Sequence, residues 1–335
     1  MLKKMLLVLL SLVFVSGAAM AVDLSGAGAT FPYPIYSKWI SDYSKATGNK
    51  INYQPIGSGG GIRQFTSGIV DFGGSDAPMT NDEISKAGGD ILHIPTVMGA
   101  VSVVYNLPGI KGLKLDANSL AGIFLGNIKM WNDDAIAKLN PSANLPNKAI
   151  TVAHRSDGSG TTDIFTNYLA KVSTGWASKV GAGKAVNWPV GVGGKGNSGV
   201  AGVVKVNEGA IGYVELSYAM ENNLSVISLK NRAGYYVIPS LDSTSASADG
   251  ALSKIPSDFR ADLTNAPGKN SYPIVGMTWL LVHKNQKDTA KGKTLVDFLK
   301  WSLTDGQKYA ADLYYAPLPK SLQSKVLKTI NTITY

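Results

Sequence analysis

One stretch of the chain combines residues that could bind an anion: His154-Arg155-Ser156-Asp157-Gly158-Ser159-Gly160-Thr161-Thr162. Apolar residues at helical spacing follow it, so we expect a helix to begin near Thr161, after a β-like run at 149–153. The turn before such a helix presents unpaired backbone N–H groups and the positive end of the helix dipole. Hydroxyls from Ser159 and Thr161 and the guanidinium of Arg155 add further donors. The pattern predicts an oxyanion-binding turn.

Two similar turns lie nearer the N-terminus. The stretch Leu24-Ser25-Gly26-Ala27-Gly28-Ala29-Thr30-Phe31 leads into a predicted helix, and Gly57-Ser58-Gly59-Gly60-Gly61 opens another. The first is not a dinucleotide motif, because Phe31 stands where the third glycine belongs, and the second lacks the spacing of a nucleophile elbow. A single glycine turn is usually only a turn. Three of them, each at a predicted helix start and each carrying Ser or Thr, favour one shared anion site.

A fourth glycine-rich stretch carries a weaker signal. Gly191, Gly193 and Gly196 match the dinucleotide pattern G-x-G-x-x-G, but no apolar strand directly precedes them and Pro189 interrupts the run. We expect a helix after these glycines that extends to about Val206. The dinucleotide interpretation is therefore not favoured.

An acidic residue follows another short predicted strand. The stretch from Ile69 to Pro78 reads as a strand that ends in a polar turn, and Asp76 lies in that turn. Taken by itself, Asp76 is best explained as the cap of a helical segment at 81–87. A role in ligand binding needs support from the rest of the chain.

Composition and the first residues indicate an exported protein. Lys3 and Lys4, an apolar run from Met5 to Val15 and small residues up to Ala21 describe a secretory signal peptide at 1–21, and its apolar run is too short to span a membrane. The chain has no cysteine, which excludes disulfides, thiolate metal sites and a lipid anchor on an N-terminal cysteine. We therefore expect a protein that diffuses freely in the periplasm.

The chain is basic, with a formal net charge of +9, or +7 once Lys3 and Lys4 are removed. Such a charge can favour nucleic acid, an anionic membrane or an anionic ligand. The lysines and arginines are scattered singly, without a basic block or interleaved aromatic residues. We therefore expect no nucleic-acid partner.

Two long apolar runs organise the chain into lobes. They lie at 94–105 and 274–283, and each is suited to a buried strand that crosses between lobes. Two crossings predict a middle lobe inserted into a first one, with lobe I at 22–96 and 273–335 and lobe II at 97–272. The segment 231–271 is the least regular part, and within it we expect a helix at about 258–263.

Five stretches, in order along the chain, are similar to those of the periplasmic phosphate-binding proteins of bacterial phosphate ABC transporters. They are Leu24-Ser25-Gly26-Ala27-Gly28-Ala29-Thr30-Phe31-Pro32, Gly57-Ser58-Gly59-Gly60-Gly61, Val70-Asp71-Phe72-Gly73-Gly74-Ser75-Asp76-Ala77-Pro78, Arg155-Ser156-Asp157-Gly158-Ser159-Gly160-Thr161 and Gly209-Ala210-Ile211-Gly212-Tyr213-Val214-Glu215. The resemblance covers about 23–320 and weakens between 231 and 271. It implies an α/β, two-lobed periplasmic binding protein of type II (Venus flytrap) with a ligand cleft between the lobes. Such a protein closes over inorganic phosphate as a monomer and delivers it to membrane permease subunits.

The resemblance also implies which residues contact the ligand. From lobe I they are Thr30, Phe31 through its backbone N–H, Ser58 and Asp76. From lobe II they are Arg155, Ser159, Gly160 through its backbone N–H, and Thr161. Asp157, two residues after Arg155, is placed to hold the guanidinium of that arginine and to neutralise part of its charge.

Asp76 then has a physical role as the residue that selects the ligand. Phosphate near neutral pH retains at least one proton, whereas sulfate retains none. An ionised Asp76 can accept a hydrogen bond from a protonated phosphate oxygen but can only repel sulfate. Arsenate also keeps a proton, so Asp76 does not reject arsenate on this ground. A binder of sulfate or arsenate remains an alternative.

A catalytic interpretation is less favoured. Ser159 and His154 could be drawn as nucleophile and base of a secreted phosphatase, but His154 lies at the end of an apolar strand and reads as an ordinary strand residue. His93 and His283 each lie in or beside an apolar run. No group of His, Asp and Glu residues has metal-ligand spacing. We expect a binding protein rather than an enzyme, with no cofactor and no metal.

Overall fold

The computed structural model describes residues 21–335, so the predicted signal peptide at 1–21 lies outside the described residues except for Ala21. Strands of the main sheet follow the order β2-β1-β3-β12-β4-β8-β6-β7, and β9 and β13 pair beside β4. Their bounds are Asp23–Gly28 (β1), Lys50–Pro55 (β2), Phe72–Ser75 (β3), Ile91–Tyr105 (β4), Thr151–Arg155 (β6), Val192–Gly194 (β7), Ala210–Glu215 (β8), Ser225–Val226 (β9), Val275–His283 (β12) and Ala316–Pro317 (β13). A small sheet contains β5 (Lys114–Leu115), β10 (Ser228–Lys230) and β11 (Tyr236–Val237).

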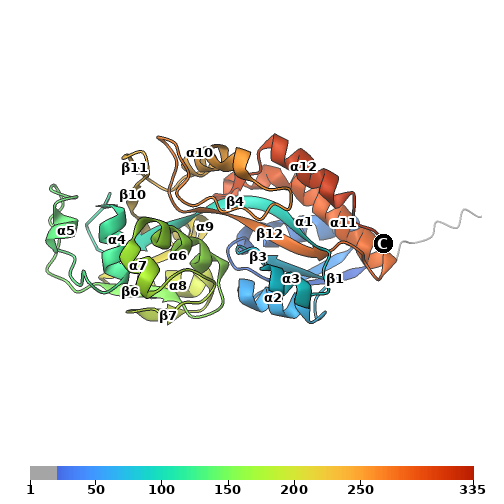
Figure 1. The fold of residues 1–335 in the computed structure, drawn as a ribbon, viewed down its shortest axis with the longest axis horizontal. Helices are drawn as coiled ribbons and strands as arrows, with labels where there is room; N and C mark the ends of the chain where they lie inside the picture. The colour runs from blue at the N-terminus through green and yellow to red at the C-terminus, as the bar shows by residue number, and fades with distance from the viewer. Residues whose placement is uncertain (1–20) are drawn as a thin grey trace, which may run out of the picture.

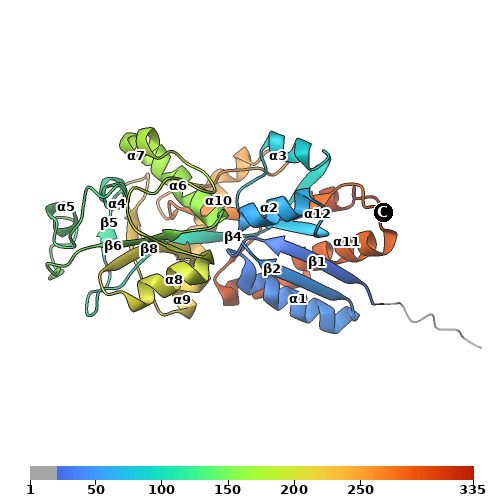
Figure 2. The ribbon, with the colours of Figure 1, turned by 90° about the horizontal axis from the view of Figure 1, so that it is seen from below.

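Helices lie in two groups on either side of the middle of this sheet (Figures 1 and 2). Lobe I contains α1 (Tyr33–Thr47), α2 (Ser58–Thr66), α3 (Asn81–Lys86), α11 (Thr289–Leu303) and α12 (Lys320–Ile330). Lobe II contains α4 (Ala117–Phe124), α5 (Asp134–Ala137), α6 (Gly160–Val172), α7 (Thr174–Lys179), α8 (Gly196–Val206) and α9 (Leu216–Glu221). The helix α10 (Leu241–Ala251) packs over β4, and short 3₁₀ turns occupy Leu252–Lys254, Asp305–Tyr309 and Ala311–Leu313. The molecule is thus the two-lobed α/β protein that the sequence predicts.

The strand β4 connects the lobes, as Figure 2 shows. Its first part pairs antiparallel with β12 as far as Ala100, which is opposite Val275, and its second part pairs antiparallel with β8 from Val101, which is opposite Glu215. From His93 onward every residue of β4 is buried, as its continuous apolar sequence predicts for a strand covered on both faces. We propose that the chain divides at these crossings, into 22–96 with 273–335 and 97–272.

Parallel strands followed by helices place the glycine turns at one edge of each half of the sheet. In lobe I, β1 pairs parallel with both β2 and β3, and in lobe II, β6 pairs parallel with β7 and β8. Parallel strands end at the same edge of a sheet, and ligands bind outside the carboxyl ends of such strands. The turns after β1, β2, β3 and β6 therefore face the space between the lobes.

The helix expected at 258–263 is absent, and the helix of this region is α10 instead. Within the expected helix, the Asp258 side chain accepts a hydrogen bond from the Arg260 backbone N–H at 3.2 Å, and Phe259 has a positive φ of 60°. Such local side-chain bonds compete with helical backbone bonds. The earlier serine-rich segment forms α10 because Ser240 and Ser243 cap its first turn reciprocally.

Within residues 21–335, no helix has both the length and the apolar character that a membrane span requires.

Close packing of α2 against the sheet gives a stability prediction. A Cβ atom on Gly61 would lie 2.4 Å from Gly28 Cα and 2.6 Å from the Ala27 carbonyl oxygen, so Gly61→Ala should destabilise the fold by roughly 2 kcal/mol or more. The matched control is Gly202, inside α8, where a Cβ atom meets nothing within 4 Å. Gly202→Ala should stabilise the protein by about 0.5–1 kcal/mol. Urea denaturation measures both, and equal effects would contradict the packing argument.

Candidate functional site

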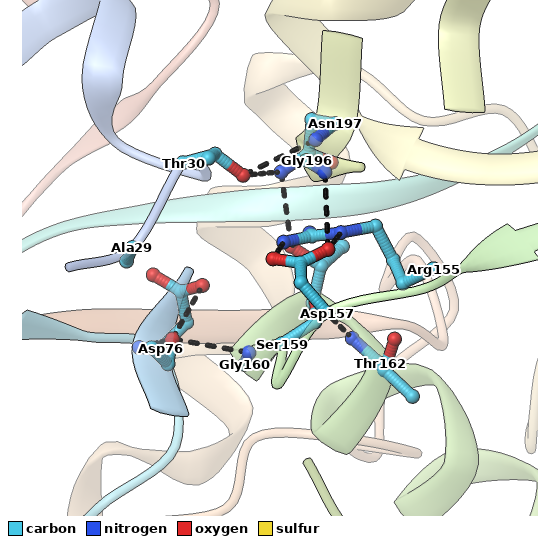
Figure 3. Close-up of polar contacts among 12 residues, drawn as sticks. Ala29, Thr30, Asp76, Arg155, Asp157, Ser159, Gly160, Thr162, Gly196 and Asn197 are labelled. Atoms are coloured by element: carbon cyan, nitrogen blue, oxygen red, sulfur yellow. Dashed lines mark hydrogen bonds and ion pairs between the residues drawn. The ribbon is translucent and has the colours of Figure 1, made fainter. Parts of the chain in front are cut away.

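Four helices begin at the same place between the lobes. The Oγ of Ser58, at the start of α2, accepts a hydrogen bond at 3.0 Å from the backbone N–H of Gly160, the first residue of α6. The Oγ1 of Thr30, just before α1, accepts one at 3.2 Å from the backbone N–H of Asn197, in the first turn of α8. Figure 3 shows the contact between Thr30 and Asn197. Their helix dipoles direct four positive ends toward one small region.

Most of these helices lack the side-chain cap that most helices elsewhere in the described part of the chain have; α12, after Pro319, is an exception. The residues before α1, α2 and α8 are Pro32, Gly57 and Lys195, and none of the three caps its helix through a side chain. By contrast, α3, α4, α7, α10 and α11 each begin with a Ser, Thr or Asp side chain that accepts a backbone N–H. An uncapped, buried helix N-terminus is suited to an anion, which accepts the same N–H groups.

Arg155 forms the fixed cation of the site, and Asp157 holds it. The Arg155 Nε donates to Asp157 Oδ1 at 2.7 Å and one terminal nitrogen donates to Oδ2 at 2.6 Å. Burial alone raises the pKa of the Asp157 carboxyl, but the hydrogen bonds and charge of Arg155 outweigh burial and hold that pKa below its usual value. The Gly196 N–H also donates to Asp157, at 3.0 Å. The pair aims the free edge of the guanidinium and leaves it little net charge.

Asp76 lies at the other side of the site, immediately after β3. It is 3% exposed, and its Oδ1 accepts a hydrogen bond from the Thr278 hydroxyl at 2.9 Å. Burial raises the pKa of Asp76 to about 7, against the opposing effects of the Thr278 hydroxyl and the Arg155 charge. The interpretation of Asp76 as the cap of the following helix is wrong, because Thr80 caps α3 in a reciprocal pair with Glu83.

The serine and glycine positions bring the two lobes into direct contact. A Cβ atom on Gly160 would lie 2.6 Å from both the Asp76 Cβ and the Ser58 Oγ, so only glycine allows this approach. Ser58 Oγ also accepts the Asp76 backbone N–H at 3.2 Å. Ser159 caps α6 by accepting the Thr162 N–H at 3.0 Å. The structure therefore brings together Ser58, Asp76 and Gly160, which the resemblance implies as ligand contacts, with Ser159 next to Gly160; their role as ligands stays a prediction.

Thr30, Phe31 and Thr161 complete the group of residues expected at the site. Thr161 Oγ1 accepts a hydrogen bond from an Arg155 terminal nitrogen at 3.3 Å, and both side chains are buried. The Tyr218 hydroxyl donates to the Thr30 carbonyl at 2.5 Å, and the Tyr315 hydroxyl donates to the Phe31 carbonyl at 2.6 Å. These two tyrosines fix the backbone that precedes α1.

Sequence reasoning missed Asn197 and Thr278. Asn197 is fully buried, and its side-chain nitrogen lies 2.9 Å from Thr30 Oγ1 and 3.1 Å from Thr161 Oγ1. Its one sequence signal was its position after Gly196, in the stretch that matched a dinucleotide pattern; that stretch opens a helix at the site. Thr278 lies in the apolar strand β12 and gave no signal.

Further polar contacts join the lobes around the site. Lys184 Nζ pairs with Glu83 Oε1 at 2.9 Å, and the Lys184 carbonyl accepts the Ser159 backbone N–H at 2.8 Å. Arg260 donates to the Met79 carbonyl at 3.1 Å and to Asn81 Oδ1 at 2.8 Å. The lobes are therefore also held together through the segment 79–83, which follows Asp76.

The histidines have partners other than the serines of the site. The His154 Nδ1 lies 3.0 Å from the Arg155 carbonyl, and its ring stacks on Trp188 at 4.8 Å between centroids. His93 Nε2 accepts the Met79 N–H at 3.0 Å, and the His283 ring lies 4.6 Å from that of Phe65. Across residues 21–335, no group of three or more His, Cys, Asp or Glu residues could hold a metal ion.

Comparison with known proteins identifies the family. A model of the PBP superfamily domain matches residues 15–305. The chain is 49% identical over 308 residues to the phosphate-binding protein PstS of Xylella fastidiosa (strain 9a5c), which covers 91% of this chain and 84% of that protein. It is 47% identical over 310 residues to the phosphate-binding protein PstS of Haemophilus influenzae (strain ATCC 51907 / DSM 11121 / KW20 / Rd), with 92% of each chain covered. The chain belongs to the PstS family.

Solved structures share the fold of this PstS family member. A high affinity periplasmic phosphate-binding protein (PfluDING) bound with phosphate aligns with a TM-score of 0.72 at 21% identity, covering 94% of this chain and 99% of that one. The phosphate binding protein of Stenotrophomonas maltophilia aligns with a TM-score of 0.69 at 21% identity, covering 92% of this chain and 94% of that one. At this level of identity the likeness establishes the two-lobed α/β fold.

A second buried carboxyl lies beneath the site in this PstS family member. Glu215 is fully buried at the end of β8; its Oε2 accepts the Ser217 N–H at 2.8 Å, and its Oε1 has no hydrogen-bond partner within the described part of the chain. Burial raises the pKa of Glu215 well above its usual value. Ser217 Oγ lies 3.2 Å from the Tyr315 hydroxyl, which holds the Phe31 carbonyl. Burial therefore favours the neutral form of the Glu215 carboxyl in the folded protein.

This burial gives a pH-dependent stability prediction for Glu215→Gln. Above the pKa of a glutamate in the unfolded chain, the folded protein keeps the Glu215 proton and unfolding releases it. The unfolding free energy of the wild type therefore falls as pH rises, by up to about 1.4 kcal/mol per pH unit. Glutamine does not titrate, so the variant avoids this loss. The variant should gain in unfolding free energy relative to wild type between pH 5 and pH 8, by at least about 1 kcal/mol. Glu208→Gln, at the surface before the same strand, is the control and should show no such change. Urea denaturation at pH 5 and pH 8 measures these unfolding free energies. If the unfolding free energies of Glu215→Gln and wild type changed equally with pH, a neutral Glu215 would be refuted.

Proposed function

We propose that this chain binds inorganic phosphate between its lobes and delivers it to the permease of a phosphate ABC transporter. One observation carries the proposal: a buried carboxyl, Asp76, faces a group of N–H and O–H donors and a held arginine across the lobe boundary. The donors suit an oxyanion, and the carboxyl suits an oxyanion that carries a proton. The identity to PstS proteins over most of the chain supports phosphate as that oxyanion.

The proposed ligands come from both lobes. They are Thr30, the Phe31 N–H, Ser58, Asp76, Arg155, Ser159, the Gly160 N–H and Thr161, with Asp157 as the residue that orients Arg155. These residues are proposed as ligands because they lie close together. Hydrogen bonds link Ser58 to Asp76 and Gly160, and they link Arg155 to Asp157 and Thr161. Because the pair Arg155–Asp157 carries little net charge, most of the affinity would come from dipolar donors in a site closed to water.

Asp76 would select phosphate through a shared proton. Two anions that face each other at hydrogen-bond distance in a buried site repel strongly unless a proton lies between them. Phosphate brings this proton, whereas sulfate requires Asp76 to be protonated first. Arsenate, which also keeps a proton, remains the competing ligand that this chemistry admits.

We propose that the protein is a binder and not a phosphatase. Ser159 Oγ is engaged as the cap of α6, and His154 bonds to the Arg155 carbonyl and stacks on Trp188. Nucleophilic catalysis by serine needs a base within hydrogen-bond reach, which His154 does not provide in this arrangement.

The proposal also concerns the setting of the protein. We propose that it is exported to the periplasm by the segment 1–21, works as a monomer, and has membrane permease subunits as partners and no nucleic acid. The scattered lysines and arginines and the basic and apolar residues of 1–21 support these points.

Calorimetric titration of phosphate-stripped protein tests the function. We expect one phosphate to bind with a Kd of about 1 μM or lower. Sulfate should bind at least roughly tenfold more weakly at pH 8, because Asp76, whose pKa is about 7, must first take up the proton that sulfate does not bring. Arsenate in a third titration shows whether a second protonated oxyanion binds. Equal affinities for phosphate and sulfate would contradict the proposed role of Asp76, and absence of phosphate binding would contradict the function itself.

The raised pKa of Asp76 predicts how sulfate binding depends on pH. A pKa of about 7 means that the neutral carboxyl, which can donate to sulfate, predominates below pH 7 and is lost above it. Sulfate affinity should therefore rise roughly tenfold between pH 8 and pH 6. Asp76→Asn should remove this dependence and relax the preference for phosphate, because an amide both donates and accepts.

A carboxyl outside the site is the matched control for Asp76→Asn. Asp71, in the same lobe, is half-buried; its Oδ2 accepts the Ser25 backbone N–H at 2.7 Å and its Oδ1 pairs with Lys291 at 2.9 Å. Asp71→Asn should keep both the preference for phosphate and the pH dependence of sulfate binding. If Asp76→Asn still rejected sulfate as the wild type does, the charge argument would be wrong.

A further inference from the structure

We propose that Asn197 is a positioning residue of the phosphate site, whose carboxamide directs the hydroxyl hydrogens of Thr30 and Thr161 toward the ligand when the lobes close. This inference deepens the proposed function and rests on it. Asn197 lies in the first turn of α8 and is fully buried. It uses its backbone N–H, its side-chain nitrogen and its side-chain oxygen in separate contacts. Figure 3 shows those that face Thr30.

The orientation of the carboxamide is determined by the backbone of β8. The Glu215 backbone N–H lies 2.9 Å from Asn197 Oδ1, and a backbone N–H can only donate. The atom that faces it must therefore be the oxygen. The nitrogen, with its two hydrogens, then necessarily points the other way, toward the two threonines.

Thr30 has no free acceptor position left. Its Oγ1 receives one hydrogen bond from the Asn197 backbone N–H at 3.2 Å and another from Asn197 Nδ2 at 2.9 Å. A hydroxyl oxygen has two lone pairs and one hydrogen. With both lone pairs engaged by Asn197, the hydroxyl can act toward a ligand only as a donor.

Both lone pairs of the Thr161 hydroxyl oxygen are also engaged, in this case by two different residues. Its Oγ1 receives a hydrogen bond from Asn197 Nδ2 at 3.1 Å and another from the Arg155 guanidinium at 3.3 Å. Each hydrogen of the Asn197 side-chain nitrogen thus goes to one threonine. Both hydroxyl hydrogens remain for the oxygens of the anion, so no energy is spent on reorienting them when the ligand binds.

The contacts with Thr30 also cross between the lobes. Thr30 precedes α1 in lobe I, whereas Asn197 and Thr161 belong to helices of lobe II. Opening of the lobes separates Thr30 from Asn197, and the Thr30 hydroxyl then regains its freedom to rotate and to accept from water. Full donor character of Thr30 is therefore a property of the closed protein, which couples closure to ligand affinity.

Variants at Asn197 test the inference by phosphate calorimetry. Asn197→Ala should raise the phosphate Kd roughly tenfold or more, because both threonine hydroxyls lose a fixed direction. The control is Asn207→Ala, at the other end of α8, where Asn207 Nδ2 donates only to the Val203 carbonyl at 2.7 Å. This control should change the Kd by less than about twofold. An unchanged Kd for Asn197→Ala would overturn the inference.

A double-mutant cycle separates positioning from a general structural effect. In a Thr30→Val background, Thr161 is the one threonine hydroxyl that Asn197 can still orient. The ratio of the Kd with Asn197→Ala to the Kd without it should therefore be at least about threefold smaller in this background than in the wild type. The same factor in both backgrounds would overturn the inference. Phosphate binding by the wild type is the internal check: if the wild type does not bind phosphate, the proposed function fails, and the inference fails with it.

A measurement on the wild type decides the matter even if Asn197→Ala does not fold. Hydrogen exchange of the Asn197 side-chain amide, followed by NMR, should slow by about tenfold or more when phosphate saturates the protein, because closure completes its contact with Thr30. The side-chain amide of Asn207 should not change. An exchange rate of the Asn197 amide that is the same with and without phosphate would overturn the coupling to closure.

Discussion

A buried carboxyl that must face an anion is the constraint on which the rest of the site depends. Asp76 is almost inaccessible to water and lies directly across from Gly160 of the other lobe. Without a proton between it and a ligand, this carboxyl would repel any anion that the surrounding donors attract. The other proposed ligands can offer the anion an N–H or O–H hydrogen, whereas the Asp76 carboxylate can only accept one. Selectivity therefore arises from a single residue, whereas affinity is distributed over many.

Because the affinity is distributed over many donors, several helices at the site begin without a side-chain cap of their own. Most helices that start elsewhere are capped by their own side chains, whereas α1, α2 and α8 have no such cap. At α8 the first N–H groups donate instead to side chains of other segments, Asp157 and Thr30. The one strong cation, Arg155, is already paired with Asp157. A site of dipoles and a neutralised cation binds a dehydrated oxyanion without a large net charge of its own, which limits non-specific attraction of other anions.

Local sequence patterns predicted those parts of the fold that depend on neighbouring residues. A strand, a glycine turn and a helix start are all encoded within about 15 residues, so the turns at Thr30, Ser58 and Ser159 could be located from the sequence. The function of Asp76 could not, because it depends on Thr278 and Gly160, which are distant in the chain. Asn197 was missed for the same reason: its contacts with Thr30 and Thr161 join three separate segments. The resemblance to phosphate-binding proteins, rather than spacing, pointed to Asp76.

The position of β12 in the sheet has a consequence for the order in which the protein matures. This strand lies between β3 and β4, yet it is made almost two hundred residues after β3. Until it emerges, a growing or translocating chain leaves the edge of the long apolar strand β4, and that of the short strand β3, without a neighbour, and such edges readily pair with other chains. Lobe II, by contrast, has all of its strands available by the end of β11. The lobe that begins first is thus completed last, and the chain needs protection from aggregation until its C-terminal part arrives.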